Sequence, residues 1–99
     1  MLFAVMFEDD PVRAAEIRSR VMPAHLAFLE RNAAAIVAAG PLLEGAARTP
    51  AGGMWLVEAD SRDRAEALTR EDPFYSAGLR RSIRILEWRR VFADGRRVA

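Results

Sequence analysis

The first segment of the chain is apolar at every position, and this limits the folds available to it. In residues 2–7, the odd-numbered positions are Phe3, Val5 and Phe7, and the even-numbered positions, beginning with Leu2, are apolar as well. Successive side chains of a strand point to opposite faces of a sheet, so a strand of this kind must be covered on both sides. Residues 54–59 and 83–92 show the same pattern. The sequence therefore predicts a sheet whose two faces are both buried.

The strands are expected to be joined by helices in the order strand, helix, strand, strand, helix, strand. After an acidic turn, a short helix is expected over residues 12–20, followed by a longer one from about Pro23 to Ala39, or by one helix kinked at Pro23. Gly40 and Pro41 are typical of a helix end. The expected buried stripe of the longer helix follows helical spacing and consists of Leu26, Leu29, Ala33, Ile36 and Val37.

The second half of the chain gives the remaining elements. Ser61 is a good N-cap for the second helix. The expected elements are a strand over residues 42–47, a turn over 49–53, a strand over 54–59, a helix over 62–70, a connecting turn over 74–79 and a strand over 83–92, with a tail after Asp94.

This order predicts an α+β ferredoxin-like βαββαβ domain with a four-stranded antiparallel sheet, formed by all 99 residues. Two helices can cover only one face of that sheet. In the last strand, Ile83 and Ile85 would face one way, with Val91, while Leu86 would face the other, with Trp88 and Phe92. Burial of each large apolar side chain contributes roughly 1.5 to 3 kcal/mol. We therefore expect a homodimer whose sheets pack face to face.

The composition excludes several classes of function. All 15 basic residues are arginine and oppose 14 acidic residues, so the net charge of +1 argues against nucleic acid as a partner. No apolar run is long enough to span a bilayer, and the start of the chain lacks the features of a secretory signal, so we expect no membrane partner and a cytoplasmic location. With no cysteine and one histidine, a metal site is not expected.

That histidine, His25, lies near the start of the segment with helical spacing. Its side chain is the first candidate for proton transfer, because an ordinary histidine titrates near neutral pH. A lone histidine is more often a structural or solvated residue, so catalysis requires the fold to bring a carboxylate to it. Ser76 has no base at a useful spacing, and Trp55, Trp88 and Phe74 are more typical of a core or an interface than of a substrate pocket.

The spacing of four short motifs resembles that of the YCII-related family. The motifs begin at Pro23 (PAHL), Gly40 (GPL), Asp72 (DPF) and Ala77 (AGL). The resemblance covers nearly the whole chain and implies a small dimeric α+β barrel. It also implies that His25 and Asp72 form an active-site pair in a pocket. Many relatives carry an arginine just before the proline of the first motif, where this chain has Met22.

The resemblance implies a cofactor-independent enzyme that converts products of aromatic degradation, such as a dehydrochlorinase acting on a chlorinated hydroxyquinol or a lactone isomerase. A carboxylate bonded to one ring nitrogen of His25 raises the basicity of the other, which then acts as a general base. Asp72 could instead only satisfy backbone donors, as an Asp before Pro commonly does. An acidic or phenolic ligand would be held by an arginine and a hydroxyl, for which the candidates are Arg18, Arg20, Arg80 and Tyr75.

Other functions fit the same residues. The chain could be a non-catalytic dimeric module that binds a small ligand or a protein in the same crevice. A haem or oxygen-handling barrel ranks last, because it needs a histidine facing a pocket large enough for a macrocycle.

Overall fold

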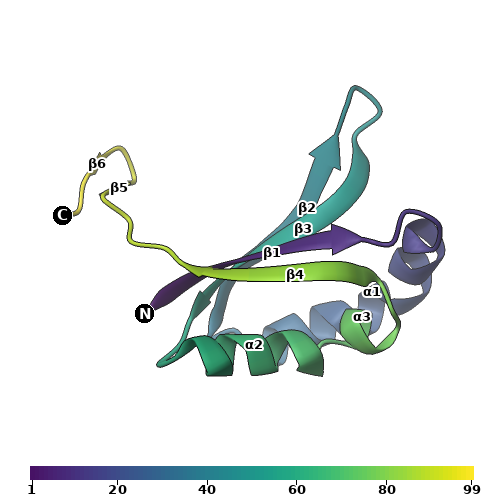
Figure 1. Cartoon of the computed structure of the whole chain (residues 1–99), viewed down its shortest axis with the longest axis horizontal. Helices are drawn as coiled ribbons and strands as arrows, with labels where there is room; N and C mark the ends of the chain where they lie inside the picture. Colours follow the sequence, from purple (N-terminus) through teal and green to yellow (C-terminus); the bar gives the residue numbers. More distant parts are fainter.

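The helices lie on one face of a four-stranded antiparallel sheet, and the other face is left open (Figure 1). The computed structural model describes residues 1–99, and the strand order is β2-β3-β1-β4. The predicted α+β fold with a four-stranded antiparallel sheet is confirmed. The elements are β1 (Leu2–Asp9), α1 (Ala14–Arg31), β2 (Ile36–Glu44), β3 (Thr49–Glu58), α2 (Arg62–Glu71), α3 (Pro73–Ser76), β4 (Arg80–Glu87), and a small hairpin of β5 (Phe92–Ala93) and β6 (Arg96–Arg97).

The hydrophobic core lies between the sheet and the helices. The odd-numbered residues of β1 are buried, as their parity predicts, and Val5 has no exposed surface. Phe7 meets Trp55 of β3 edge to face, with 5.0 Å between the ring centroids. Phe28 from α1 and Leu68 from α2 complete this cluster. The register of β1 between β3 and β4 is therefore fixed, because a slip of one residue would turn its buried side chains to the opposite face.

The first helix differs from the prediction. It runs without a break through Pro23 and ends at Arg31, well before Ala39. Asn32 ends it, with its side-chain amide donating to the Phe28 carbonyl at 2.9 Å. Ile36 and the residue after it belong to β2, where a β-branched side chain is favoured. The predicted stripe is right only in part: Leu29 packs against the core and Ile36 is buried, but Leu26 is 48% exposed. The buried residues of α1 are Ala14, Ile17, Val21, His25 and Phe28.

Several boundaries in the rest of the chain also move. The turn of the β2–β3 hairpin lies at residues 45–48, so the segment 49–53 belongs to β3 and is not a turn. Gly52 is needed there, because a Cβ at this position would collide with the Phe7 carbonyl oxygen of β1. Residues 73–76 form a turn of helix. The last strand of the sheet ends at Glu87, so Val91 and Phe92 lie in a C-terminal arm.

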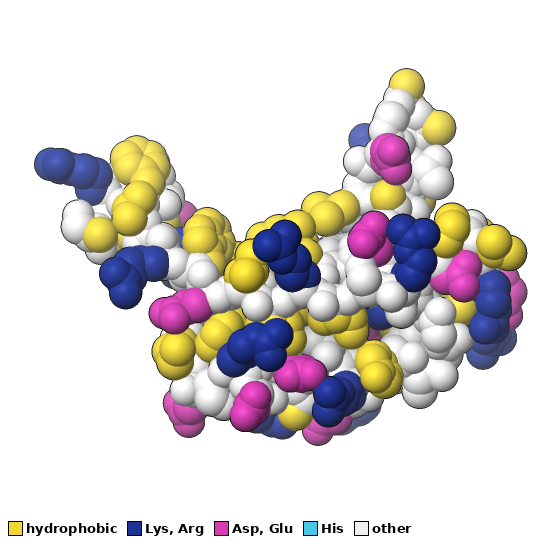
Figure 2. Space-filling model, viewed as in Figure 1, with side chains coloured by type: hydrophobic (Ala, Val, Ile, Leu, Met, Phe, Trp, Pro, Cys, Tyr) yellow, Lys and Arg dark blue, Asp and Glu magenta, His cyan; other side chains and the backbone are white.

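The open face of the sheet is partly apolar. Leu86 on β4 and Leu42 on β2 are 48% and 41% exposed, while Met6 of β1 is half-buried. The C-terminal arm and the β2–β3 hairpin both project on this side of the sheet, and hydrophobic side chains gather on the surface between them (Figures 1 and 2). None of the helices is both long enough and apolar enough to cross a bilayer.

Candidate active site

His25 is buried against the sheet and bonded to Asp72. It lies one helical turn after Val21 on the face of α1 that packs against the core, and its side chain is 9% exposed. The ring Nδ1 is 2.8 Å from Oδ1 of Asp72. Because a carboxylate only accepts hydrogen bonds, Nδ1 carries the proton of this bond. The ring also stacks on Phe74, with centroids 4.0 Å apart and planes inclined by 21°.

Asp72 is placed by the junction between α2 and α3. The following Pro73 favours an extended backbone at residue 72, which has φ −71° and ψ 131°. The same Oδ1 accepts the backbone N–H of Phe74 at 3.1 Å and so caps α3, and the side chain is only 1% exposed. Asp72 therefore serves both as the expected backbone cap and as the partner of His25.

A small cavity opens beside the pair. It has a volume of about 120 Å³ and lies between α1 and the β2–β3 side of the sheet. Nδ1 is the only ring nitrogen of His25 that bonds to the protein, so Nε2 is left for a ligand. The wall of the cavity includes Arg18, His25, Pro41, Trp55 and Arg80.

Two arginines in this wall are held by one buried carboxylate, that of Asp9. Arg18 donates to Oδ2 of Asp9 through Nε at 3.0 Å and Nη2 at 2.7 Å, and Arg80 donates to Oδ1 through Nη1 at 3.0 Å. Arg18 Nη2 also donates to the Gly52 carbonyl at 3.1 Å. Asp9 of β1 is paired with Arg80 of β4. The register of these two strands shifts between Glu8 and Asp9, at the end of β1.

Arg80 is unusually enclosed for a guanidinium. Its charged end lies 4.1 Å from the centroid of the Phe7 ring and 5.3 Å from that of Phe74. Burial lowers its pKa from the ordinary arginine value, while the nearby charges of Asp9 and Asp72 oppose the shift. Its Nε is buried without a hydrogen-bond partner.

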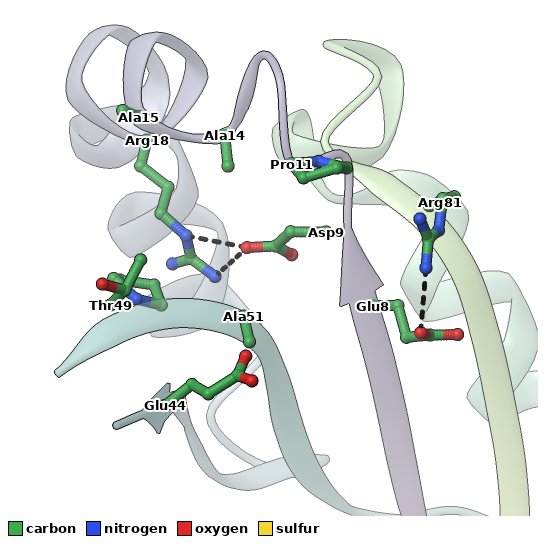
Figure 3. A pocket seen from close by; sticks show the side chains of 11 residues that line it. Glu8, Asp9, Pro11, Ala14, Ala15, Arg18, Glu44, Thr49, Ala51 and Arg81 are labelled. Atoms are coloured by element: carbon green, nitrogen blue, oxygen red, sulfur yellow. Dashed lines mark hydrogen bonds and ion pairs between the residues drawn. The ribbon is translucent and has the colours of Figure 1, made fainter. Parts of the chain in front are cut away.

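A larger crevice lies on another side of Arg18, between the start of α1 and the β2–β3 hairpin (Figure 3). Its volume is about 400 Å³, and its charged lining consists of Glu8, Asp9, Arg18, Glu44 and Arg81. His25 does not line this crevice. The histidine is therefore at the smaller cavity, whereas the larger crevice holds only carboxylates and arginines as charged groups.

The structure brings four of the predicted site residues together, namely His25, Asp72, Arg18 and Arg80. Arg20 is instead on the surface, where its Nε donates to Glu16 at 2.8 Å. Tyr75 is 43% exposed. Neither Arg20 nor Tyr75 lines the cavity.

The sequence reasoning missed two residues at the site. Asp9 was overlooked, although it continues the buried odd parity of β1 beyond Phe7. Gly53 lines the cavity, and a Cβ there would lie 3.3 Å from Nη1 of Arg80. No group of three or more potential metal ligands is clustered in the structure.

The family model of the YCII-related domain matches residues 1–89. The chain belongs to this family, as the motifs had indicated. It is similar to a solved structure of 5-chloro-2-hydroxyhydroquinone dehydrochlorinase (TftG) from Burkholderia phenoliruptrix AC1100, in complex with 2,5-dihydroxybenzoquinone. The two share 31% sequence identity over 90% of this chain and 94% of the other, with a TM-score of 0.80. The comparison with curated proteins finds no match.

Proposed function

We propose that the protein is a cofactor-independent enzyme that uses His25 as a general base on a small phenolic or otherwise acidic ring compound. The observation that carries this proposal is the buried bond between His25 and Asp72 beside a cavity. The carboxylate fixes the ring with its proton on Nδ1 and stabilises the imidazolium that forms when Nε2 takes a proton. Asp72 thus orients the base.

The size and charge of the cavity support a single ring as substrate. A cavity of about 150 Å³ holds benzene, and the volume here is about 120 Å³, so no more than one ring enters and its substituents extend through the opening. Its ionisable wall groups are His25, Arg18 and Arg80, which offer N–H donors to a phenolate or carboxylate. The similarity to a dehydrochlorinase solved with a dihydroxybenzoquinone agrees with this class of ligand.

Dehydrochlorination of a chlorinated hydroxyquinol suits such a base. Nε2 takes a hydroxyl proton and returns it to the carbon that carries chlorine, which gives a ketone tautomer. Removal of a second hydroxyl proton then expels chloride with the electrons of the C–Cl bond. The products are a hydroxyquinone and HCl, so the reaction needs no external oxidant. Isomerisation of a lactone would use the same base to move a proton between carbon atoms.

The test is turnover of 5-chloro-2-hydroxyhydroquinone, followed by chloride release and by the absorbance of the quinone. A panel of lactones tests the isomerase reaction. We expect His25→Ala to abolish turnover while the circular dichroism spectrum stays that of the parent. Arg20→Gln changes an exposed residue of the same helix and should leave the rate unchanged.

The second candidate is a non-catalytic binding module, which the same enclosed cavity would suit. It is favoured if the parent binds 2,5-dihydroxybenzoquinone but converts no compound of either class. If His25→Ala turns over substrate as fast as the parent, the general-base proposal is wrong.

We also propose that two copies pack through the open faces of their sheets. Leu86 and Leu42 are each more than 40% exposed there, and Trp88, just beyond β4, is 42% exposed. Burial of several such side chains per subunit favours association by several kcal/mol, at roughly 1.5 to 3 kcal/mol each. Sedimentation analysis of the protein tests this homodimer.

A further inference from the structure

Asp9 is a buried carboxylate that the general-base mechanism does not use. Its side chain is 2% exposed, and each of its oxygens accepts from a different arginine. Oδ2 binds Arg18, as Figure 3 shows, and Oδ1 binds Arg80. Removing one partner of a buried ion pair leaves the other charge uncompensated, so both arginines depend on Asp9 for their position.

The arrangement leaves hydrogen-bond donors free on the two arginines. Arg18 uses Nε and Nη2, and Arg80 uses Nη1, which leaves Arg18 Nη1 and Arg80 Nη2 without a partner in the protein. Both arginines line the cavity that contains His25, whereas Asp9 and Asp72 do not. The cavity therefore presents donors to a ligand, with the carboxylates behind them.

The charges of the cluster are unevenly placed. Two guanidinium groups are balanced by the carboxylates of Asp9 and Asp72, but only the arginines line the cavity, so its wall presents positive charge to a ligand. The Nε of Arg80 is also buried without a partner, although unpaired buried donors are rare and costly. A structural core gains little from such a cluster, because well-packed apolar residues are usually at least as stable.

We propose that Asp9 is a positioning residue, which holds Arg18 and Arg80 so that their free N–H groups bind the oxygen atoms of an anionic ring. This inference rests on the proposed function for the ring ligand and adds the requirement of negative charge. Substrates that ionise, such as hydroxyquinols and hydroxyquinones, would be bound in preference to neutral rings of the same shape. Asp9 acts through the arginines and does not itself contact the substrate.

Binding of two matched probes by the full chain tests this role. 2,5-Dihydroxybenzoquinone is a vinylogous acid and is anionic at neutral pH, whereas 2,5-dimethoxy-1,4-benzoquinone has the same ring and no charge. For Asp9→Asn, we expect the Kd of the anion to rise by about tenfold or more, the usual effect of losing a charge-assisted hydrogen bond. The Kd of the neutral probe should stay within about twofold, because an uncharged ring gains little from the guanidinium charges and so depends little on their position.

Glu8→Gln is the matched control. Glu8 is the neighbouring carboxylate on β1 and binds Arg81 of β4 at 3.1 Å, as Asp9 binds Arg80, but it is exposed and does not line the cavity. This variant should bind both probes as the parent does.

A double-mutant cycle shows whether Asp9 acts through Arg80. In an Arg80→Gln background, Asp9→Asn should weaken anion binding much less than it does alone, because one of its two targets is gone. The double variant also removes a matched pair of charges, so it remains informative if Asp9→Asn alone does not fold.

Equal affinity of Asp9→Asn and the parent for the anion would overturn the inference, as would an equal loss of affinity for both probes. A parent that binds neither quinone would contradict both this inference and the proposed ligand class. Because binding requires no turnover, failure of His25 as the base would leave the result on Asp9 unaffected.

Discussion

Replacing Asp72 by Asn tests the bond that carries the proposed function. The substitution keeps the shape of the side chain but removes the charge that faces Nδ1 of His25. Because the same Oδ1 bonds His25 and caps α3, an Asn side chain can keep its oxygen at the cap or turn its amide to His25, but not both. A hydrogen bond to a charged group contributes about 1.5 to 3 kcal/mol to stability. At about 4 to 8 °C of melting temperature per kcal/mol for a domain of this size, we expect the melting temperature to fall by at least about 6 °C at fixed protein concentration.

The effect on turnover should be larger than the effect on stability. The Asn amide can donate to Nδ1 and so favour the ring tautomer whose Nε2 carries a proton and cannot act as a base. We expect kcat to fall by about 10² to 10⁴-fold, while the Kd of 2,5-dihydroxybenzoquinone changes little. Steady-state kinetics and absorbance titration measure the two quantities.

Asp10→Asn is the control for loss of a capping charge. Asp10 accepts the backbone N–H groups of Val12 and Arg13 at 2.9 and 3.3 Å, away from His25. The Asp10→Asn variant should leave kcat unchanged. An Asp72→Asn variant that keeps the kcat of the parent would refute the reasoning, because the charge on Asp72 would then play no part in activating the base.

Three further predictions concern the cavity, the surface and the open face. Gly53→Ala places a Cβ 3.3 Å from Arg80 Nη1, so the guanidinium must shift and absorbance titration should show weaker binding of 2,5-dihydroxybenzoquinone. The pKa of Glu8 is lowered by hydrogen bonds from Ser82 and Arg81. Ionised Glu8 therefore stabilises the fold above the ordinary carboxyl pKa, and this stabilisation is lost as the pH falls through the pKa of Glu8 in the folded protein. Chemical denaturation should therefore show that Glu8→Gln loses less stability than the parent between about pH 5 and pH 2. Leu86→Glu should yield monomers in sedimentation analysis if the open faces pair, whereas Val12→Glu, at a position 89% exposed, should not.

The order of the elements could be predicted because local patterns determine it. The alternating burial of β1 agrees with its parity, and Ser61 caps α2 by accepting the N–H of Arg64 at 3.1 Å, as its residue type suggests. The end of α1 could not be placed in the same way. The alanines after Arg31 are compatible with a continued helix. The helix ends at Arg31 because Asn32 caps it and because Ile36 pairs with Val57 of β3.

The site was predictable only in part, for a related reason. The resemblance to the YCII-related family implied the pair of His25 and Asp72, which are 47 residues apart in the sequence and bonded at 2.8 Å in the structure. Arg20 and Arg18 are two residues apart on one helix and therefore point in different directions, yet composition cannot distinguish them. Only packing against β1 shows that Arg18 turns inward to Asp9 while Arg20 stays with Glu16 on the surface.

Two buried carboxylates thus bond to the side chains that would contact a ligand, and we expect each to affect a different step. Asp72 bonds to His25 and would set the strength of the base, whereas Asp9 bonds to Arg18 and Arg80 and would set the affinity for an anion. Phe74 lies against the ring of His25, and the guanidinium of Arg80 is also within 5.3 Å of its centroid, so one aromatic ring joins the two clusters. If the tasks are separate, Asp72→Asn lowers kcat with little change in ligand affinity, and Asp9→Asn raises KM more than it lowers kcat. If both variants instead lose both kcat and ligand affinity, the two carboxylates stabilise a single structural unit.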